Sequence, residues 1–246
     1  MMVVVAVNPK QLMKQIPVLI YSFLLCLCSV SAQTFDHSKW TDVLQNYVTE
    51  NGKVNYIDLQ NNREAFNEYL LDLVSNSPKD NWSNAEKKAY WINAYNAFTI
   101  QLILENYPLK SIKDLNDPWD QTFFKINGKM MSLNTIEHKI LRPMGDPRIH
   151  FAIVCASESC PRLLNYAYAA ETLNIQLNQA ASDFINDASK NSITASKITI
   201  SKLFKWFKSD FPKGDAFINY LNTHSIVKIS PEAKINYQNY NWSLNE

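Results

Sequence analysis

The sequence predicts a single-domain α+β protein with a central buried helix, several further helices and a small, mostly antiparallel sheet. Three observations lead to this prediction. Helical periodicity dominates the residues that follow position 32, one of these helices is apolar on nearly all sides, and strand patterns are short and scattered later in the chain. No strand–helix–strand repeat links those strands, so the pattern favours α+β over a parallel α/β fold.

The first 32 residues have the composition of a cleavable signal peptide. Lys10 and Lys14 provide a positive segment, residues 16–28 are apolar, and small residues precede a cleavage site after Ala32. The apolar run is shorter than the about 20 residues that a membrane-spanning helix needs. We therefore expect a secreted or periplasmic protein with no stable membrane span after cleavage.

Two alternatives for this segment remain open. One is an uncleaved anchor, and the other is a lipoprotein acylated at Cys26 or Cys28, although neither cysteine follows the small residue expected there. Cleavage after Ala32 would leave residues 33–246, which are 214 of the 246 residues and suit one domain.

Charge and glycine content exclude several classes of function. Without Lys10 and Lys14 the chain keeps 22 basic against 23 acidic residues, so no basic excess is available for nucleic acid. Only four glycines occur, far apart, so a glycine-rich phosphate loop and a nucleophile elbow are absent. No cofactor is expected, and the expected partner is an unidentified small molecule or peptide.

The strongest helix prediction covers residues 83–105. Ser83 and Glu86 form a capping-box pattern at its start, and Tyr107-Pro108 ends it. Because apolar residues cover nearly all its sides, we expect this helix to be buried centrally. Further helices are expected at residues 37–50, 58–73, 134–141 (capped by Asn134), 171–187 and 217–221.

Strand patterns are shorter. Asn127-Gly128 separates the apolar runs 123–126 and 129–131, which predicts a hairpin with a type I′ turn. Residues 149–155 form a continuous apolar run that predicts a strand buried on both faces. An edge strand or hairpin is expected at 192–203, and a closing strand at 235–240.

Two asparagines interrupt the apolar helix. Asn93 and Asn96 are three residues apart and therefore emerge on one face. A buried amide must be hydrogen-bonded, since leaving it unpaired costs about 1–3 kcal/mol. Either these amides fasten a neighbouring backbone segment, or they orient a catalytic base or line a pocket.

Reactive residue types are concentrated between positions 137 and 160. Glu137 and His138 lie on the predicted short helix, His150 lies within the predicted strand, and Cys155 ends that strand. Cys160 follows in a polar loop. A thiol with candidate imidazole bases and orienting groups is the set that a Cys–His hydrolase needs.

The two cysteines left after cleavage allow four interpretations. An even pair in an oxidising compartment favours a structural Cys155–Cys160 disulfide. Either cysteine could instead be a free nucleophile activated by a helix N-terminus and a nearby imidazole. Zinc bound by His138, His150, Cys155 and Cys160 is a third interpretation, although the close Cys-x-x-Cys spacing is missing. Inert buried thiols are the fourth.

Three motifs in order resemble a known family. These are residues 89–97 (AYWINAYNA), 136–142 (IEHKILR) and 146–161 (DPRIHFAIVCASESCP). Together they resemble the family catalogued as domain of unknown function 547, over a core of about residues 83–184. Residues 240–245 also resemble the ending of exported bacterial members. The family has no established activity, so the resemblance assigns no catalytic residue or cofactor.

Two main functional hypotheses follow, and the sequence leaves open whether the protein is an enzyme. The first is a thiol-dependent hydrolase or acyl-transferase acting on a peptide or amide, and the second is a binding domain braced by the disulfide. A zinc or redox site is the third. The candidate catalytic residues are Cys155, His138, His150, Cys160 and Glu137, and the candidate binding residues are Asn93, Asn96, Tyr95, Arg142 and Arg148.

Overall fold

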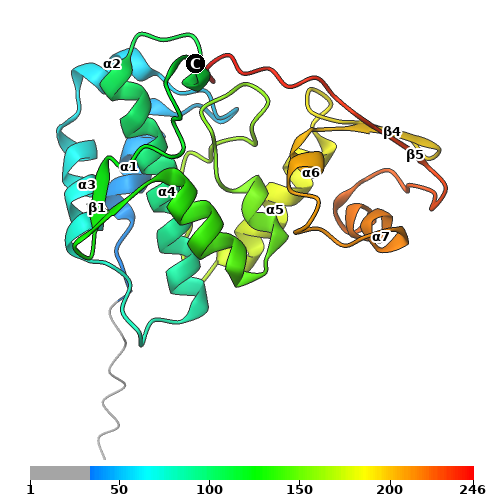
Figure 1. Cartoon of the computed structure of the whole chain (residues 1–246), viewed down its shortest axis with the longest axis horizontal. Coiled ribbons are helices and arrows are strands. Elements are labelled where there is room, and N and C mark those ends of the chain that lie inside the picture. Colours follow the sequence, from blue (N-terminus) through cyan, green and yellow to red (C-terminus); the bar gives the residue numbers. More distant parts are fainter. Residues whose placement is uncertain (1–33) are drawn as a thin grey trace, which may run out of the picture. The chain divides into compact units, whose positions relative to one another are not determined.

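A computed structural model describes residues 34–246, so the predicted signal peptide lies outside the described residues. The described residues form one compact unit, and helices dominate two small sheets, which confirms the α+β prediction. Figure 1 shows the helices of the first half on one side and the later strands with the last helices on the other. Within residues 34–246, no helix combines the length and apolar character needed to cross a membrane.

Four α-helices make up the first half of the described chain. They are α1 (Ser38–Tyr47), α2 (Tyr56–Asn61), α3 (Glu64–Ser75) and α4 (Asn84–Asn106). The predicted single helix over 58–73 is wrong, because the chain breaks at Asn62. The Asn62 amide donates to the backbone carbonyl and the side chain of Asp58, which replaces the helical continuation.

Helix α4 confirms the strongest prediction. The Ser83 hydroxyl accepts from the Glu86 backbone N–H, and the Glu86 carboxylate accepts from the Ser83 N–H, which completes the capping box. Side chains on nearly all sides of α4 are buried, so the helix lies inside the larger group of packed apolar side chains. It is the scaffold from which the neighbouring segments are held.

The hairpin prediction is also confirmed. Strands β1 (Phe124–Ile126) and β2 (Lys129–Met131) pair antiparallel across Asn127 and Gly128. Both turn residues have positive φ, 50° and 75°, as a type I′ turn requires.

The segment after the hairpin winds through short, non-standard helices. Thr135–Leu141 forms the π-helix η3, followed by the 3₁₀ helices η4 (Arg142–Met144) and η5 (Pro147–Phe151). A further 3₁₀ turn, η2 (Ile112–Asp114), follows α4. The predicted Asn134 cap is wrong: the Asn134 amide donates to Asp120 instead, at 2.6 Å. π-Helical turns occur frequently at functional sites.

The predicted buried strand over 149–155 is wrong. Asp146 caps the 3₁₀ helix η5 by accepting from the Arg148 N–H, and Pro147 opens it. Periodicity alone cannot separate a buried strand from another buried conformation. Here the apolar residues are divided between two packed groups, with Ile149 in the larger and Phe151 in the smaller. This segment therefore lies where the two groups meet.

The last part of the chain supplies most of the smaller group of packed apolar side chains. It contains α5 (Leu173–Asn186), β3 (Ser192–Ile193), β4 (Lys197–Ile200), α6 (Leu203–Trp206), α7 (Asp215–His224) and β5 (Lys234–Tyr237). The helices predicted at 171–187 and 217–221, the hairpin predicted at 192–203 and the closing strand predicted at 235–240 are confirmed. Helix α6 was not predicted. Strand β4 pairs antiparallel with β3 and parallel with β5, so this sheet is mixed.

Candidate functional site

Asn93 and Asn96 fasten neighbouring backbone, which is the first of the two roles considered for them. The Asn93 amide donates to the Tyr168 carbonyl at 2.8 Å and accepts from the Tyr168 N–H at 3.0 Å. Asn96 does the same for Ala152 and Val154, at 2.9 and 2.8 Å. Each amide thus satisfies a buried donor and a buried acceptor that lack strand partners. The clamp of Asn96 holds the segment that leads to Cys155.

One pocket of about 400 Å³ collects most of the predicted site residues. It lies against α4, η3, the segment 150–161, α6 and the C-terminal residues. Its lining consists of Tyr95, Trp119, Asn134, Glu137, His138, Arg142, His150, Ile153, Cys155, Cys160, Pro161, Leu203, Trp206, Phe207, Tyr240 and Trp242. We call it the disulfide pocket.

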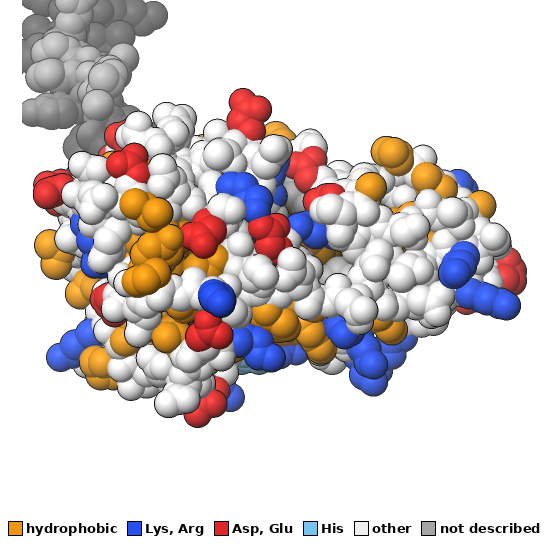
Figure 2. All heavy atoms as spheres, turned by 90° about the horizontal axis from the view of Figure 1, so that it is seen from above, with side chains coloured by type: hydrophobic (Ala, Val, Ile, Leu, Met, Phe, Trp, Pro, Cys, Tyr) orange, Lys and Arg blue, Asp and Glu red, His pale blue; other side chains and the backbone are white. Residues whose placement is uncertain are grey.

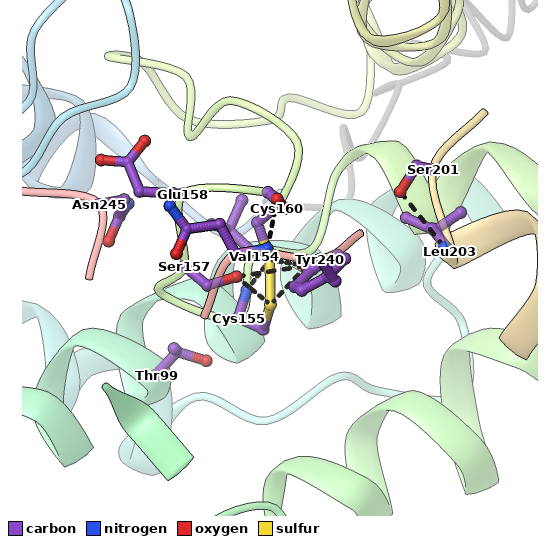
Figure 3. Close-up of a disulfide and its surroundings, with 12 residues drawn as sticks. Thr99, Val154, Cys155, Ser157, Glu158, Cys160, Ser201, Leu203, Tyr240 and Asn245 are labelled. Atoms are coloured by element: carbon purple, nitrogen blue, oxygen red, sulfur yellow. Dashed lines mark hydrogen bonds between the residues drawn. A yellow bond between two sulfur atoms is a disulfide. The ribbon is translucent and has the colours of Figure 1, made fainter. Parts of the chain in front are cut away.

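Cys155 and Cys160 form a disulfide in the wall of this pocket. The Tyr240 hydroxyl donates to Cys160 Sγ at 3.2 Å and lies 3.3 Å from Cys155 Sγ (Figure 3). The Ser157 hydroxyl donates to the Tyr240 oxygen at 3.2 Å. With the sulfur atoms bonded to each other, neither cysteine is a free nucleophile in this form.

The C-terminal segment is fastened to the disulfide loop by its backbone. Ser157 and Leu244 form an antiparallel bridge, and the Glu158 N–H donates to the Ser243 carbonyl at 2.8 Å. The Asn241 N–H donates to the Ser159 hydroxyl at 2.8 Å. These contacts bring Tyr240 and Trp242 to the pocket.

Glu137 is a buried carboxyl group in the pocket. Its side chain extends from the π-helix η3, the residue is 5 % exposed, and its Oε2 accepts from the Tyr95 hydroxyl at 3.3 Å. Burial raises the pKa of Glu137 from 4.5 to about 7, against the lowering effects of the Tyr95 hydrogen bond and the Arg142 charge. A carboxyl group that titrates near neutral pH in a pocket is a candidate functional group.

Arg142 contacts His138 directly and is connected to His150 through Asp210. Its Nε and Nη2 bind the two Asp210 oxygens at 2.6 and 2.7 Å, and its Nη1 lies 2.7 Å from His138 Nδ1. His150 Nε2 lies 2.8 Å from Asp210 Oδ2. Burial lowers the pKa of His138 and lowers that of His150 to about 4, so both imidazoles are neutral at pH 7. The Arg142 hydrogen bonds hold the pKa of Asp210 well below its usual range.

Four aromatic side chains form a cluster on one side of the pocket. Trp206 and Trp242 stack with ring centroids 5.6 Å apart, and Tyr240 lies 4.7 and 4.5 Å from them. Trp119 meets Trp242 edge-on at 5.7 Å. Trp206 keeps 46 % of its surface exposed, which is large for a tryptophan in a packed protein.

Three predicted site residues lie outside the pocket. Asn93 and Asn96 are the backbone clamps described above, and Arg148 is paired with Asp146 and with two amides of α5. Asp210 and the aromatic cluster are functional candidates that the sequence analysis missed. The resemblance of residues 240–245 to the ending of exported family members marked Tyr240 and Trp242 without giving them a role, and no motif marked Trp119, Trp206 or Asp210.

The residues proposed as zinc ligands do not form a metal site. Cys155 and Cys160 are bonded to each other, and within residues 34–246 no group of three or more His, Cys, Asp or Glu is placed to hold a metal ion.

Residues 79–185 match the model of a family described as "Protein of unknown function, DUF547". The chain resembles the DUF547 family. The predicted core of about 83–184 agrees with the matched range, and no curated protein or solved structure matches the chain. The DUF547 range contains Tyr95, Trp119, Glu137, both histidines and both cysteines of the pocket. Trp206, Tyr240 and Trp242 come from beyond it, so residues outside the DUF547 range complete the pocket.

Proposed function

We propose that the protein is a binding protein whose disulfide pocket holds a small molecule or a short peptide segment. The observation that carries this proposal is convergence. Seven of the ten residues predicted from the sequence line one pocket of about 400 Å³, together with an aromatic cluster contributed by distant segments. Ligand pockets commonly combine apolar and aromatic walls with a few polar groups, at volumes of about 300–1,000 Å³.

The state of the cysteines favours binding over thiol catalysis. The disulfide joins two residues that line the pocket, and its loop holds the C-terminal segment that supplies Tyr240 and Trp242. A bonded sulfur cannot attack a carbonyl group, whereas a braced wall needs no free thiol. The disulfide therefore has a supporting role in this proposal.

A thermal-shift screen tests the proposal. The chain beginning at Gln33 is heated with amino acids, amines, sugars, carboxylic acids and short peptides, and a pocket ligand is expected to raise the melting temperature. Trp206→Ala should remove that rise. Ile175→Ala is the matched control, because Ile175 is an exposed large apolar residue on α5 that does not line the pocket. A ligand that stabilises the wild type and Trp206→Ala equally would bind elsewhere and contradict the proposal.

A Cys–His hydrolase or acyl-transferase is the second candidate, and one observation favours it. Reduction of the disulfide would place two thiols in a pocket that His138 and His150 also line. Iodoacetamide labelling of the native protein without reductant separates the candidates. Rapid labelling of Cys155, with loss of peptidase or esterase activity in Cys155→Ala and His138→Ala, would favour the enzyme. Labelling only after reduction, with no activity in the reduced protein, would exclude it.

Export with cleavage after Ala32 is part of the same proposal, since an oxidising compartment favours the disulfide. Expression with the native N-terminus followed by intact-mass analysis of secreted and membrane fractions tests it. A chain that begins at Gln33 and is two hydrogen atoms lighter than the reduced form is expected. An uncleaved chain in the membrane fraction would contradict it.

A further inference from the structure

The Arg142 guanidinium in the pocket already has hydrogen-bond partners. Arg142 uses Nε and Nη2 on Asp210, Nη2 also on the Ser209 hydroxyl, and Nη1 on His138. A guanidinium has five N–H donors, and its charge is matched here by the Asp210 carboxylate. Four of the five N–H groups are therefore engaged, and an anionic ligand would have to displace a partner to accept from two of them.

The Glu137 carboxyl group has a different status. Its Oε2 accepts from Tyr95, and among residues 34–246 no side chain or backbone N–H donates to its Oε1. Within residues 34–246, some buried polar atoms lack both solvent contact and a hydrogen-bond partner. Glu137 Oε1 does not belong to this group. Since Glu137 lines the disulfide pocket, this oxygen is an acceptor that remains available to a ligand.

The aromatic cluster also favours a cationic ligand. The face of an aromatic ring carries negative potential, so it attracts cations and repels anions. Trp119, Trp206, Tyr240 and Trp242 line the pocket, and Lys113 Nζ already lies 5.2 Å from the Trp242 ring centroid. Glu137 thus shares a pocket with four aromatic rings, and aromatic residues with a nearby carboxylate suit the binding of an ammonium group.

Other charges do not reverse this preference. Both pocket histidines are neutral at pH 7, as their lowered pKa values require. Residues 188–246 carry eight lysines against four acidic residues, and Figure 2 shows lysine and arginine side chains on the outer surface. Solvent and salt screen such exposed charges over about 8 Å at physiological ionic strength.

We propose that the disulfide pocket binds an organic cation, with its ammonium group beside Glu137 and against the faces of Trp206, Tyr240 and Trp242. This inference rests on the proposed binding function and gives it a ligand class. The pocket of about 400 Å³ is large enough for a small alkylammonium or quaternary ammonium compound.

A pair of isosteric probes tests the charge directly. Choline and 3,3-dimethylbutan-1-ol have nearly the same shape, but only choline is charged. Isothermal titration of the chain beginning at Gln33, at pH 8, should give at least about tenfold tighter binding of choline than of the neutral alcohol, since a desolvated cation–π contact with a carboxylate corresponds to that ratio. Spermidine serves as a second cation, and acetate and glucose serve as anionic and neutral probes.

Two variants locate the site. Glu137→Gln keeps the shape of the side chain and should weaken choline binding about tenfold or more. Glu64→Gln, which removes an exposed carboxylate on α3, should leave binding unchanged. Trp206→Ala should weaken choline binding as well, while Ile175→Ala should not.

The pH dependence gives an independent readout. The titratable and charged groups that line the pocket near Glu137 are Tyr95, His138, Arg142, His150 and Tyr240, with Asp210 bound to Arg142. Tyr95 and Tyr240 have raised pKa values and stay neutral, while Arg142 and Asp210 stay charged. Glu137, with its pKa of about 7, is the acidic group that ionises between pH 5.5 and pH 8. Choline binding should therefore weaken at pH 5.5, and Glu137→Gln should remove this change.

The outcomes separate the two proposals. Equal affinity for choline and its neutral isostere, or tighter binding of acetate or glucose than of both cations, would overturn the cation assignment and leave the binding function standing. If no probe and no member of the thermal-shift screen binds, the proposed function fails as well.

Discussion

Arg142 and Asp210 are joined by two hydrogen bonds, from Nε to Oδ2 at 2.6 Å and from Nη2 to Oδ1 at 2.7 Å, across 68 residues of sequence. Arg142 belongs to the DUF547 range and Asp210 lies beyond it. The pair therefore fastens the C-terminal part of the chain to the segment that carries Glu137 and His138. His138 and His150 are both oriented by this pair.

Arg142→Lys should destabilise the protein by about 1–3 kcal/mol, because an ammonium group cannot reproduce two parallel bonds to one carboxylate. Urea unfolding measures this cost. The matched control is Arg162→Lys, whose pair with Asp183 is more exposed and should cost less than about 1 kcal/mol. Equal costs for the two substitutions would show that the Arg142–Asp210 pair does not fasten the C-terminal part.

Asn96→Ala should be among the most destabilising single substitutions, at about 2–5 kcal/mol. It leaves the Ala152 carbonyl and the Val154 N–H unpaired in the interior. Asn106→Ala removes only one half-buried bond at the end of α4 and should cost about 1 kcal/mol or less. Thermal unfolding of both variants checks the difference, and similar melting temperatures would contradict the clamp role.

Glu137→Gln should change how stability depends on pH. The pKa of Glu137 is about 7 in the folded protein and 4.5 ordinarily, so between these values the folded state keeps a proton that the unfolded state has lost. Stability linked to Glu137 is thus full below about pH 4.5 and decreases as pH rises to about 7, by roughly 3 kcal/mol at most.

Glutamine cannot ionise, so the variant should be more stable than the wild type at pH 8 and about equally stable at pH 4.5. Because the difference between variant and wild type is measured, the titrations of other groups largely cancel. A variant that is less stable than the wild type at pH 8 would show that the folded protein favours the ionised Glu137.

Replacing both cysteines by alanine should lower stability by about 2 kcal/mol, as expected for the loss of a short disulfide loop. It should also loosen the C-terminal segment, because Tyr240 and the bridge from Ser157 to Leu244 depend on the shape of this loop. Hydrogen exchange at Glu158 and Asn241, whose N–H groups donate to the Ser243 carbonyl and the Ser159 hydroxyl, should accelerate more than exchange within α4. Unchanged exchange at these amides would mean that the disulfide does not hold the segment.

Local signals in the sequence were sufficient for several elements. The capping box of Ser83 and Glu86 and the apolar character that follows predicted α4, and Asn127-Gly128 predicted the hairpin turn. Each of these depends on residues within one or two turns of chain. The segment 149–155 was predicted wrongly, since its apolar run fits a buried strand and a buried 3₁₀ turn equally well. The amide of Asn96, from 56 and 58 residues earlier, satisfies the backbone there.

The sequence by itself determined the α+β class, the central helix and the group of reactive residues between positions 137 and 160. Only the tertiary structure decided that Cys155 is bonded to Cys160, that Asn93 and Asn96 are clamps, that Asp210 binds Arg142 and His150, and that the aromatic cluster lines the pocket. The physical reason is the range of the interactions. Helix caps and turns are satisfied by neighbours in sequence, whereas a pocket is formed by side chains that meet only after the apolar core has packed.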